Sequence, residues 1–142
     1  MQVFIIGSPL ETAQALDSRR LHKQVIEGRQ ILRVIAGNSD AWAHHPATLQ
    51  YYGRFTWLLH YVLCLHNYRK GRIETAQRWS EMADKRRPDF HTQEYFDQMK
   101  RRLYTKDPQH YAQWEHLGTS DVNWYFINGA WKYYKNGKTT KK

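Results

Sequence analysis

The stretch LDSRRLHKQVIEGRQIL, residues 16–32, decides how the rest of the chain is interpreted. Apolar residues recur through it at steps of three and four, a spacing that gathers their side chains on one side of a helix. The members of this apolar stripe are Leu21, Val25, Gly28, Leu32 and, just beyond the stretch, Ile35. The pattern predicts an amphipathic helix whose apolar stripe faces the protein core.

A polar stripe runs beside the apolar one and contains Asp17, Arg20, Gln24 and Glu27. Its place at the margin of the core implies that the Glu27 carboxylate is partly desolvated, and nearby arginines would fix its charge and orientation. Two interpretations follow from the spacing. The stripe is either a solvated face with ordinary helical ion pairs, Asp17 with Arg20 and Lys23 with Glu27, or a carboxylate mounted with its helpers over a site. Spacing alone favours the ion pairs.

Signals for the two ends of this helix lie outside the stretch. Ser8 is a candidate N-cap, Pro9 suits the first turn, and Glu11 completes the spacing of a capping box. Gly37 suits the position that follows the last helical residue. We therefore expect one helix between Ser8 and Gly37.

Helical patterns also dominate the chain that follows. Pro46 is expected to open a helix that runs through residues 47–71, which are apolar nearly all round and therefore predict the central buried helix. Further helical segments are predicted at 72–88, at 89–108 and around Tyr111 and Trp114. The fold class is therefore mostly α, with residues 1–142 forming a single compact helical domain.

The two ends of the chain do not follow the helical pattern. Residues 2–7, QVFIIG, predict a short strand or an extended arm. Residues 124–142 are aromatic and then basic, and Gly129 and Gly137 interrupt any helix there. We expect an irregular C-terminal tail whose last part, about 135–142, is flexible and basic.

Composition indicates a basic protein with many aromatic residues. Lys and Arg number 22 against 13 acidic residues, which gives a formal net charge of +9, and aromatics make up 15% of the chain. A basic surface attracts phosphates and aromatic rings stack on bases, so nucleic acid is a candidate partner, although Trp and Tyr are also ordinary core residues. The single cysteine, Cys64, lies in an apolar run and predicts a buried thiol in a reducing compartment. With no signal peptide pattern and no apolar run of about 18 residues, we expect a cytoplasmic protein without membrane contact. We also expect a monomer.

Familiar catalytic motifs are mostly absent. One cysteine rules out cysteine-based zinc sites, and the eight histidines form no HExxH motif. The adjacent His44 and His45 are potential metal ligands, but a loop or packing role is the more probable one on general grounds. A metal-dependent nuclease needs several converging carboxylates, which the spacing of the acidic residues does not provide. We expect no metal and no cofactor.

Four stretches resemble the pyrimidine-dimer DNA glycosylase family, the relatives of phage endonuclease V. Residues 16–32 match the pattern LDxxRLxKQxxExxQIL of its bacterial branch. AWAHHPA (41–47) is similar to a W-x-x-H-P-A loop of that branch, and residues 90–114 are similar to its later helix and K-D-P-x-x-Y element. AWKYYKNG (130–137) resembles the aromatic and basic end of the phage enzymes. The resemblance touches most of the chain and is most specific in the first block.

The resemblance implies an endonuclease V-like helical fold and a glycosylase coupled to an abasic-site lyase, acting on DNA without a metal. In that family the N-terminal α-amine attacks the sugar C1′ and forms an imine, and a glutamate on the first long helix assists. Glu27 occupies the position of that glutamate. The chemistry is reasonable because an α-amine has a pKa near 7.7–8.0, so that much of it is free base at neutral pH.

Residue 2 is Gln rather than the small Thr of the phage enzymes, which discourages removal of the initiator methionine, so the resemblance assigns the nucleophilic amine to Met1. The two arginines that flank the phage glutamate correspond to Ile26 and Gln30. Their role is therefore taken over by Arg20, Lys23 or Arg29, or it is absent. Two alternatives to a pyrimidine-dimer substrate stay open, namely another damaged or modified base and a loss of activity. The residues expected to contact DNA are Gln2, Arg19, Arg20, Lys23, Gln24, Arg29, His45, Lys106, Lys132 and Lys135.

The expected partner is double-stranded DNA with a damaged or modified base or an abasic site, in the nucleoid of a bacterial or phage-infected cell. Two alternatives remain open on the sequence. A non-enzymatic nucleic-acid-binding module would keep the basic surface and the aromatic tail without the chemistry. A metal-dependent nuclease would depend on His44 and His45.

Overall fold

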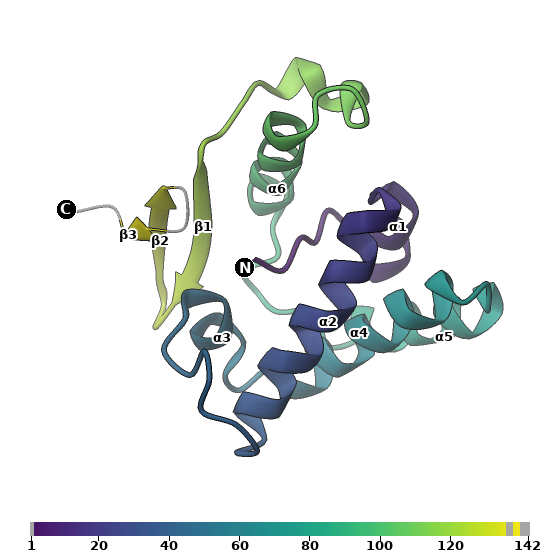
Figure 1. Ribbon diagram of the computed structural model, residues 1–142, viewed down its shortest axis with the longest axis vertical. Coiled ribbons are helices and arrows are strands. Elements are labelled where there is room, and N and C mark those ends of the chain that lie inside the picture. The colour runs from purple at the N-terminus through teal and green to yellow at the C-terminus, as the bar shows by residue number, and fades with distance from the viewer. Residues whose placement is uncertain (1, 136–137, 140–142) are drawn as a thin grey trace.

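Seven helices and a small antiparallel sheet make up the part of the chain described by the computed structural model, residues 2–135 and 138–139 (Figure 1). The helices are α1 (Pro9–Ala15), α2 (Ser18–Ile35), α3 (Pro46–Tyr51), α4 (Phe55–Arg69), α5 (Ile73–Asp84), α6 (Gln93–Lys106) and the short 3-10 helix η1 (Ala112–Leu117). The strands are β1 (Val122–Ile127), β2 (Ala130–Lys135) and β3 (Lys138–Thr139), in the order β1-β2-β3. The mostly α fold class is confirmed. Within the described residues, no helix has the length and apolar composition needed to cross a membrane.

The predicted single helix between Ser8 and Gly37 is wrong, because the chain breaks into α1 and α2. The capping box at the start of α1 is present as predicted, with the Glu11 N–H donating to Ser8 Oγ and the Ser8 N–H donating to Glu11 Oε1. The break falls at Asp17, whose carboxylate accepts from the Arg20 N–H and so acts as the N-cap of α2. The Asp17 N–H donates to the hydroxyl of Tyr111 at 3.0 Å, and this external partner replaces the helical one.

The predicted central helix is also two elements, α3 and α4. Gly53, at φ +81°, lies in the turn between them, a conformation that glycine adopts without steric cost. Helix α4 is buried as predicted and packs against both α2 and α5. Gly28 of α2 permits this close approach, because a Cβ there would lie 2.4 Å from Cγ2 of Val62. Cys64 is fully buried on α4, and burial raises the pKa of its thiol to about 12.

The N-terminal segment is an extended arm, the second of the two predicted forms. Residues 2–5 are all buried, and they run between α2 and the β1 and α6 side of the molecule (Figure 1). Val3 and Ile5 are 2% and 0% exposed, so the arm contributes to the hydrophobic core.

The C-terminal region corrects the predicted irregular tail, because β1 and β2 form a hairpin. Asn128 and Gly129 make its turn with φ of 53° and 76°, the two positive values that a two-residue hairpin turn requires. Burial alternates along β1, which is the period of a half-buried strand. Of the expected flexible end, Lys135 belongs to β2 and 138–139 to β3, while residues 136–137 and 140–142 lie outside the described part of the chain.

Candidate functional site

A cavity of about 260 Å³ lies where the N-terminal arm, α2, the end of α6 and the start of β1 meet. Its lining residues are Gln2, Phe4, Arg19, Arg20, Lys23, Gln24, Glu27, Lys106 and Asn123. Four of these side chains are cationic and one is acidic. The structure thus brings together seven of the residues that the sequence singled out, from three separate parts of the chain.

Glu27 is half-buried on the wall of this cavity, at the margin of the core as its stripe predicted. Burial raises the pKa of the Glu27 carboxyl, and the positive charges of Lys23 and Lys106 act in the opposite direction. The predicted ion pair with Lys23 is wrong, since no contact within 4.0 Å joins these two described side chains. A carboxyl with a raised pKa, close to cations but in no ion pair with another described side chain, is suited to transferring protons.

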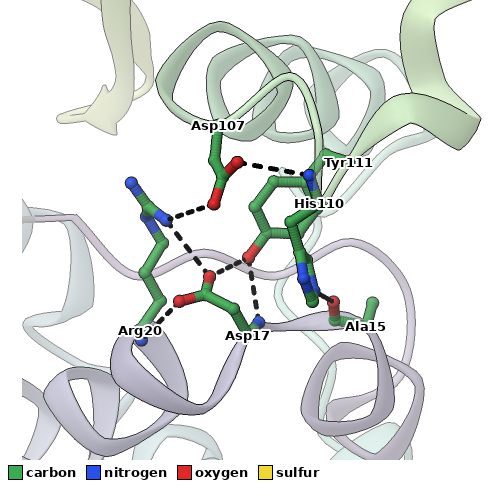
Figure 2. Close-up of polar contacts among 6 residues, drawn as sticks. All are labelled: Ala15, Asp17, Arg20, Asp107, His110 and Tyr111. Atoms are coloured by element: carbon green, nitrogen blue, oxygen red, sulfur yellow. Dashed lines mark hydrogen bonds and ion pairs between the residues drawn. The ribbon is translucent and has the colours of Figure 1, made fainter.

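The predicted pair of Asp17 and Arg20 is present at 3.2 Å and belongs to a larger cluster (Figure 2). Arg20 also lies 3.8 Å from Asp107, and the Tyr111 hydroxyl donates to the Asp17 carboxylate. Burial works to raise the pKa of Asp17, but the hydrogen bonds from Tyr111 and Arg20 and the Arg20 charge outweigh it and lower the pKa. Two carboxylates therefore balance the charge of Arg20, which leaves Arg19, Lys23 and Lys106 as the cavity's less compensated cations.

Lys106, at the C-terminal end of α6, places a side-chain amine on the cavity wall in addition to that of Lys23. Burial lowers the pKa of Lys106, and the positive charges of Arg102, Arg20 and Lys23 lower it further. Arg102 itself is buried and donates from Nε to Asn123 Oδ1 at 2.8 Å. A lysine with a lowered pKa carries more free base than usual at neutral pH, so it has some of the character of a nucleophile.

Gln2 and Gln24 line the cavity but are only 3% and 4% exposed. The Gln24 amide hydrogen-bonds to the backbone of the N-terminal arm, and Gln2 Nε2 donates to the carbonyl oxygen of Trp124 at 2.9 Å. Both polar groups of the Gln24 amide and the Nε2 of Gln2 are therefore already engaged within the protein, whereas Gln2 Oε1 is buried without a hydrogen-bond partner among the described residues. This geometry favours a role in holding the arm over the predicted contact with DNA.

Three further predicted contacts lie away from the cavity lining. Arg29 is on another face of α2, where its charge, after burial, contributes to lowering the pKa of His66. His45 has the packing role that the sequence favoured, because its Nδ1 accepts from the Ala47 N–H at 3.1 Å and caps α3. Lys132 is exposed on β2.

Two other predicted residues cannot be located in the same way. Met1 and the side chain of Lys135 lie outside the described part of the chain. Among the described residues, no group of three or more His, Cys, Asp or Glu side chains is arranged to hold a metal ion.

Sequence reasoning missed two lining residues, Phe4 and Asn123. Asn123 reaches the cavity only because β1 packs beside α6, a pairing of segments that the sequence pattern did not reveal. Phe4 lines the cavity because of the path that the N-terminal arm follows. The arm belongs to none of the described strands, so a strand pattern does not indicate this position.

A half-buried carboxyl among cations, set in a cavity of a helical protein, is an arrangement that suits acid–base chemistry on an anionic substrate. Residues 1–81, more than half of the chain, match the model of the family described as pyrimidine dimer DNA glycosylase. The chain belongs to this family, as the resemblance implied, and the family is by its description one of DNA glycosylases. No curated protein and no solved structure matches the chain.

Proposed function

We propose that the protein is a DNA repair glycosylase with abasic-site lyase activity, which excises a damaged or modified pyrimidine through an imine formed by the Met1 α-amine. One observation carries the proposal. Glu27 is a half-buried carboxyl with a raised pKa in a cationic cavity, and Gln2, the residue after Met1, lines the same cavity. Family membership supports the glycosylase part of the proposal.

The proposed reaction begins with attack of the uncharged α-amine on C1′ of the deoxyribose. The C1′–N bond to the amine forms while the glycosidic bond breaks, and the base leaves with that electron pair and takes up a proton. The attached nitrogen then loses a proton, the C1′–O4′ bond breaks as the nitrogen lone pair forms the C1′=N bond, and O4′ takes up a proton, which gives the protonated imine. Loss of a C2′ proton drives β-elimination, in which the C3′–O bond breaks and the 3′ phosphate leaves. Glu27 stabilises the positive charge on the sugar as a carboxylate and moves the protons of ring opening and elimination.

In this proposal the phosphates of the DNA backbone are bound by Arg19, Lys23 and Lys106. Phosphate contacts of this kind release counterions, so affinity should fall with the logarithm of salt concentration. A base inside a duplex is out of reach of the cavity, so the enzyme must flip a nucleotide or bend the DNA. Which pyrimidine lesion is taken depends on contacts made at that stage.

The test is covalent trapping of the imine with borohydride on duplex DNA that contains one abasic site. We expect a trapped adduct for the wild-type protein. Glu27→Gln should lower strand cleavage by about 10²–10⁴-fold, the usual contribution of a general acid or base, with DNA affinity unchanged within a few-fold. Glu81→Gln, at an exposed position on α5, is the matched control and should retain activity. No adduct, with binding that depends steeply on salt, would leave a DNA-binding module without the chemistry.

A second experiment identifies the attacking amine. Peptide mapping of the trapped adduct should find the label on Met1, and acetylation of the α-amine should abolish trapping. Lys106→Arg keeps the positive charge but removes the primary amine, and it should trap normally. An adduct that survives acetylation and disappears in Lys106→Arg would transfer the nucleophile from Met1 to Lys106.

A further inference from the structure

We propose that Gln24 is a positioning residue, which holds the N-terminal arm so that the chain's α-amine is presented to the cavity of Glu27. The inference rests on the proposed function and adds the device that fixes the nucleophile. Gln24 is itself 4% exposed and is placed to touch the arm rather than the substrate.

The contacts between Gln24 and the arm are short and buried. Gln24 Nε2 donates to the carbonyl oxygen of Gln2 at 2.6 Å, and Gln24 Oε1 accepts from the Phe4 N–H at 2.9 Å. The two partners fix the orientation of the amide, because a carbonyl oxygen only accepts and a backbone N–H only donates. One side chain thereby satisfies two backbone groups of the arm that water does not reach.

The Gln24 amide takes the place of a neighbouring strand. Residues 2–5 are extended but belong to none of the described strands, so their polar groups lack a ladder partner. A residue of a parallel strand beside them would pair with the carbonyl of one residue and the N–H of the residue two further on. The Gln24 side chain makes this pair of bonds with Gln2 and Phe4. A carboxylate lacks the donor for this task, and an alkyl side chain lacks both groups.

Two other residues hold the same arm. The Tyr61 hydroxyl lies 2.8 Å from the Phe4 carbonyl oxygen and 2.6 Å from Gln24 Oε1, and its one proton serves either acceptor. Burial raises the pKa of Tyr61 well above its ordinary value, so this hydroxyl remains a donor. At the other end, the Gln2 side chain donates to the Trp124 carbonyl oxygen of β1 at 2.9 Å. The arm is therefore fixed from α2, α4 and the hairpin together.

The position of Gln24 connects the hydrogen bonds that hold the arm to Glu27, the proposed acid–base group. Gln24 and Glu27 are three residues apart on α2, so one rigid helix carries both. The proposed nucleophile is one residue upstream of Gln2, whose carbonyl is the atom that Gln24 holds. Because a misplacement of about 1 Å can cost about 10²-fold in rate, an arm released at Gln2 should react poorly even with Glu27 intact.

Gln24→Glu tests the proposal, because it keeps the shape and exchanges the amide for a titrating group. Above the pKa of the introduced carboxyl, the oxygen that replaces Gln24 Nε2 faces the Gln2 carbonyl oxygen, so the donor is lost and the two acceptors repel each other. Below that pKa, the acid O–H donates to Gln2 and the other oxygen still accepts from Phe4. Burial raises the pKa of such a carboxyl, by several units at fully buried sites, so the switch should fall in an accessible range.

The measurement is the single-turnover rate of borohydride trapping on abasic-site DNA, taken as the ratio of variant to wild type at each pH. We expect Gln24→Glu to trap about 30-fold more slowly than wild type near pH 8 and about 3-fold more slowly near pH 5.5. DNA affinity should stay within about 3-fold of wild type at both values, because the phosphate-binding cations are untouched. Gln14→Glu, exposed on α1, is the matched control and should show no loss that depends on pH.

A second variant and a second measurement cover the case in which Gln24→Glu does not fold near pH 8. Tyr61→Phe removes one hydroxyl and should slow trapping several-fold at every pH, and unchanged trapping would overturn the proposal. Hydrogen exchange at the Phe4 amide reports directly on whether the arm is held. Faster exchange in Gln24→Glu with trapping equal to wild type would refute the positioning role and leave the proposed function standing. Absence of trapping by the wild-type protein would refute the proposed function, and the positioning role with it.

Discussion

Replacement of Asp17 by alanine should destabilise the fold by about 2–3 kcal/mol. The carboxylate caps α2 by accepting from the Arg20 N–H, and loss of such a cap costs about 1 kcal/mol. It also accepts from the Tyr111 hydroxyl, which would be left as a donor without an acceptor, at about another 1 kcal/mol. The ion pair with Arg20 joins side chains that are 17% and 25% exposed, so it adds only about 0.5 kcal/mol.

Urea unfolding followed by circular dichroism measures this difference directly. For a chain of this size a loss of 2–3 kcal/mol corresponds to a fall in Tm of about 5–10 °C. Asp17→Asn keeps a cap acceptor and loses only the charge, so it should cost about 1 kcal/mol. A free energy of unfolding for Asp17→Ala within about 0.5 kcal/mol of wild type would show that the cluster does not join α2 to the turn after α6.

The same carboxylate should give the protein a dependence of stability on pH. The pKa of Asp17 is lowered from its ordinary value of 3.8, so the unfolded state binds the proton more readily than the folded state. Its contribution is therefore complete above about pH 4 and is lost as the pH falls through the lowered folded value. The stability gap between wild type and Asp17→Asn should narrow below about pH 4, and a gap that stays constant down to pH 2 would contradict the argument.

Three further predictions concern packing, reactivity and the charge of the cavity. Gly28→Ala should destabilise by about 1–3 kcal/mol in thermal unfolding despite the better helix propensity of alanine, because the added Cβ would lie 2.4 Å from Cγ2 of Val62. Cys64 is 0% exposed with a thiol pKa of about 12, so a thiol reagent near pH 8 should label the unfolded protein and leave the native one unmodified. Lys106→Met removes a cation that opposes the effect of burial on Glu27, so carboxyl NMR titration should find the pKa of Glu27 higher than in wild type.

Local sequence signals predicted the parts of the site that depend on one helix. The spacing of Asp17, Arg20 and Glu27 with the apolar stripe placed the carboxylate at the margin of the core, where the structure has it. The capping box at Ser8 and the position of Gly37 after α2 were likewise predicted, because each involves residues within one turn of a helix end. Such signals require no knowledge of what packs against the helix.

Features that depend on distant partners were not predictable from those signals. The break before α2 depends on Tyr111, which lies 94 residues from Asp17 in sequence. The hydrogen bonds of Gln24 are made with an arm whose sequence carries no pattern for pairing with a glutamine side chain. For the hairpin, Asn128-Gly129 is a recognisable turn signal, but the basic and aromatic composition around it favoured an irregular tail.

The hydrogen bond from Gln2 to Trp124 has a consequence for the order in which the protein is made. It joins residues 122 positions apart, so the surroundings of the arm are complete only after β1 has been synthesised. The long loop closed by this contact must form against its own entropy, which makes docking of the arm a late step of folding. A nascent or truncated chain that ends before β1 would carry Glu27 and its cations with the arm unanchored on one side. The cavity around Glu27 would therefore be complete only once β1 has joined the fold.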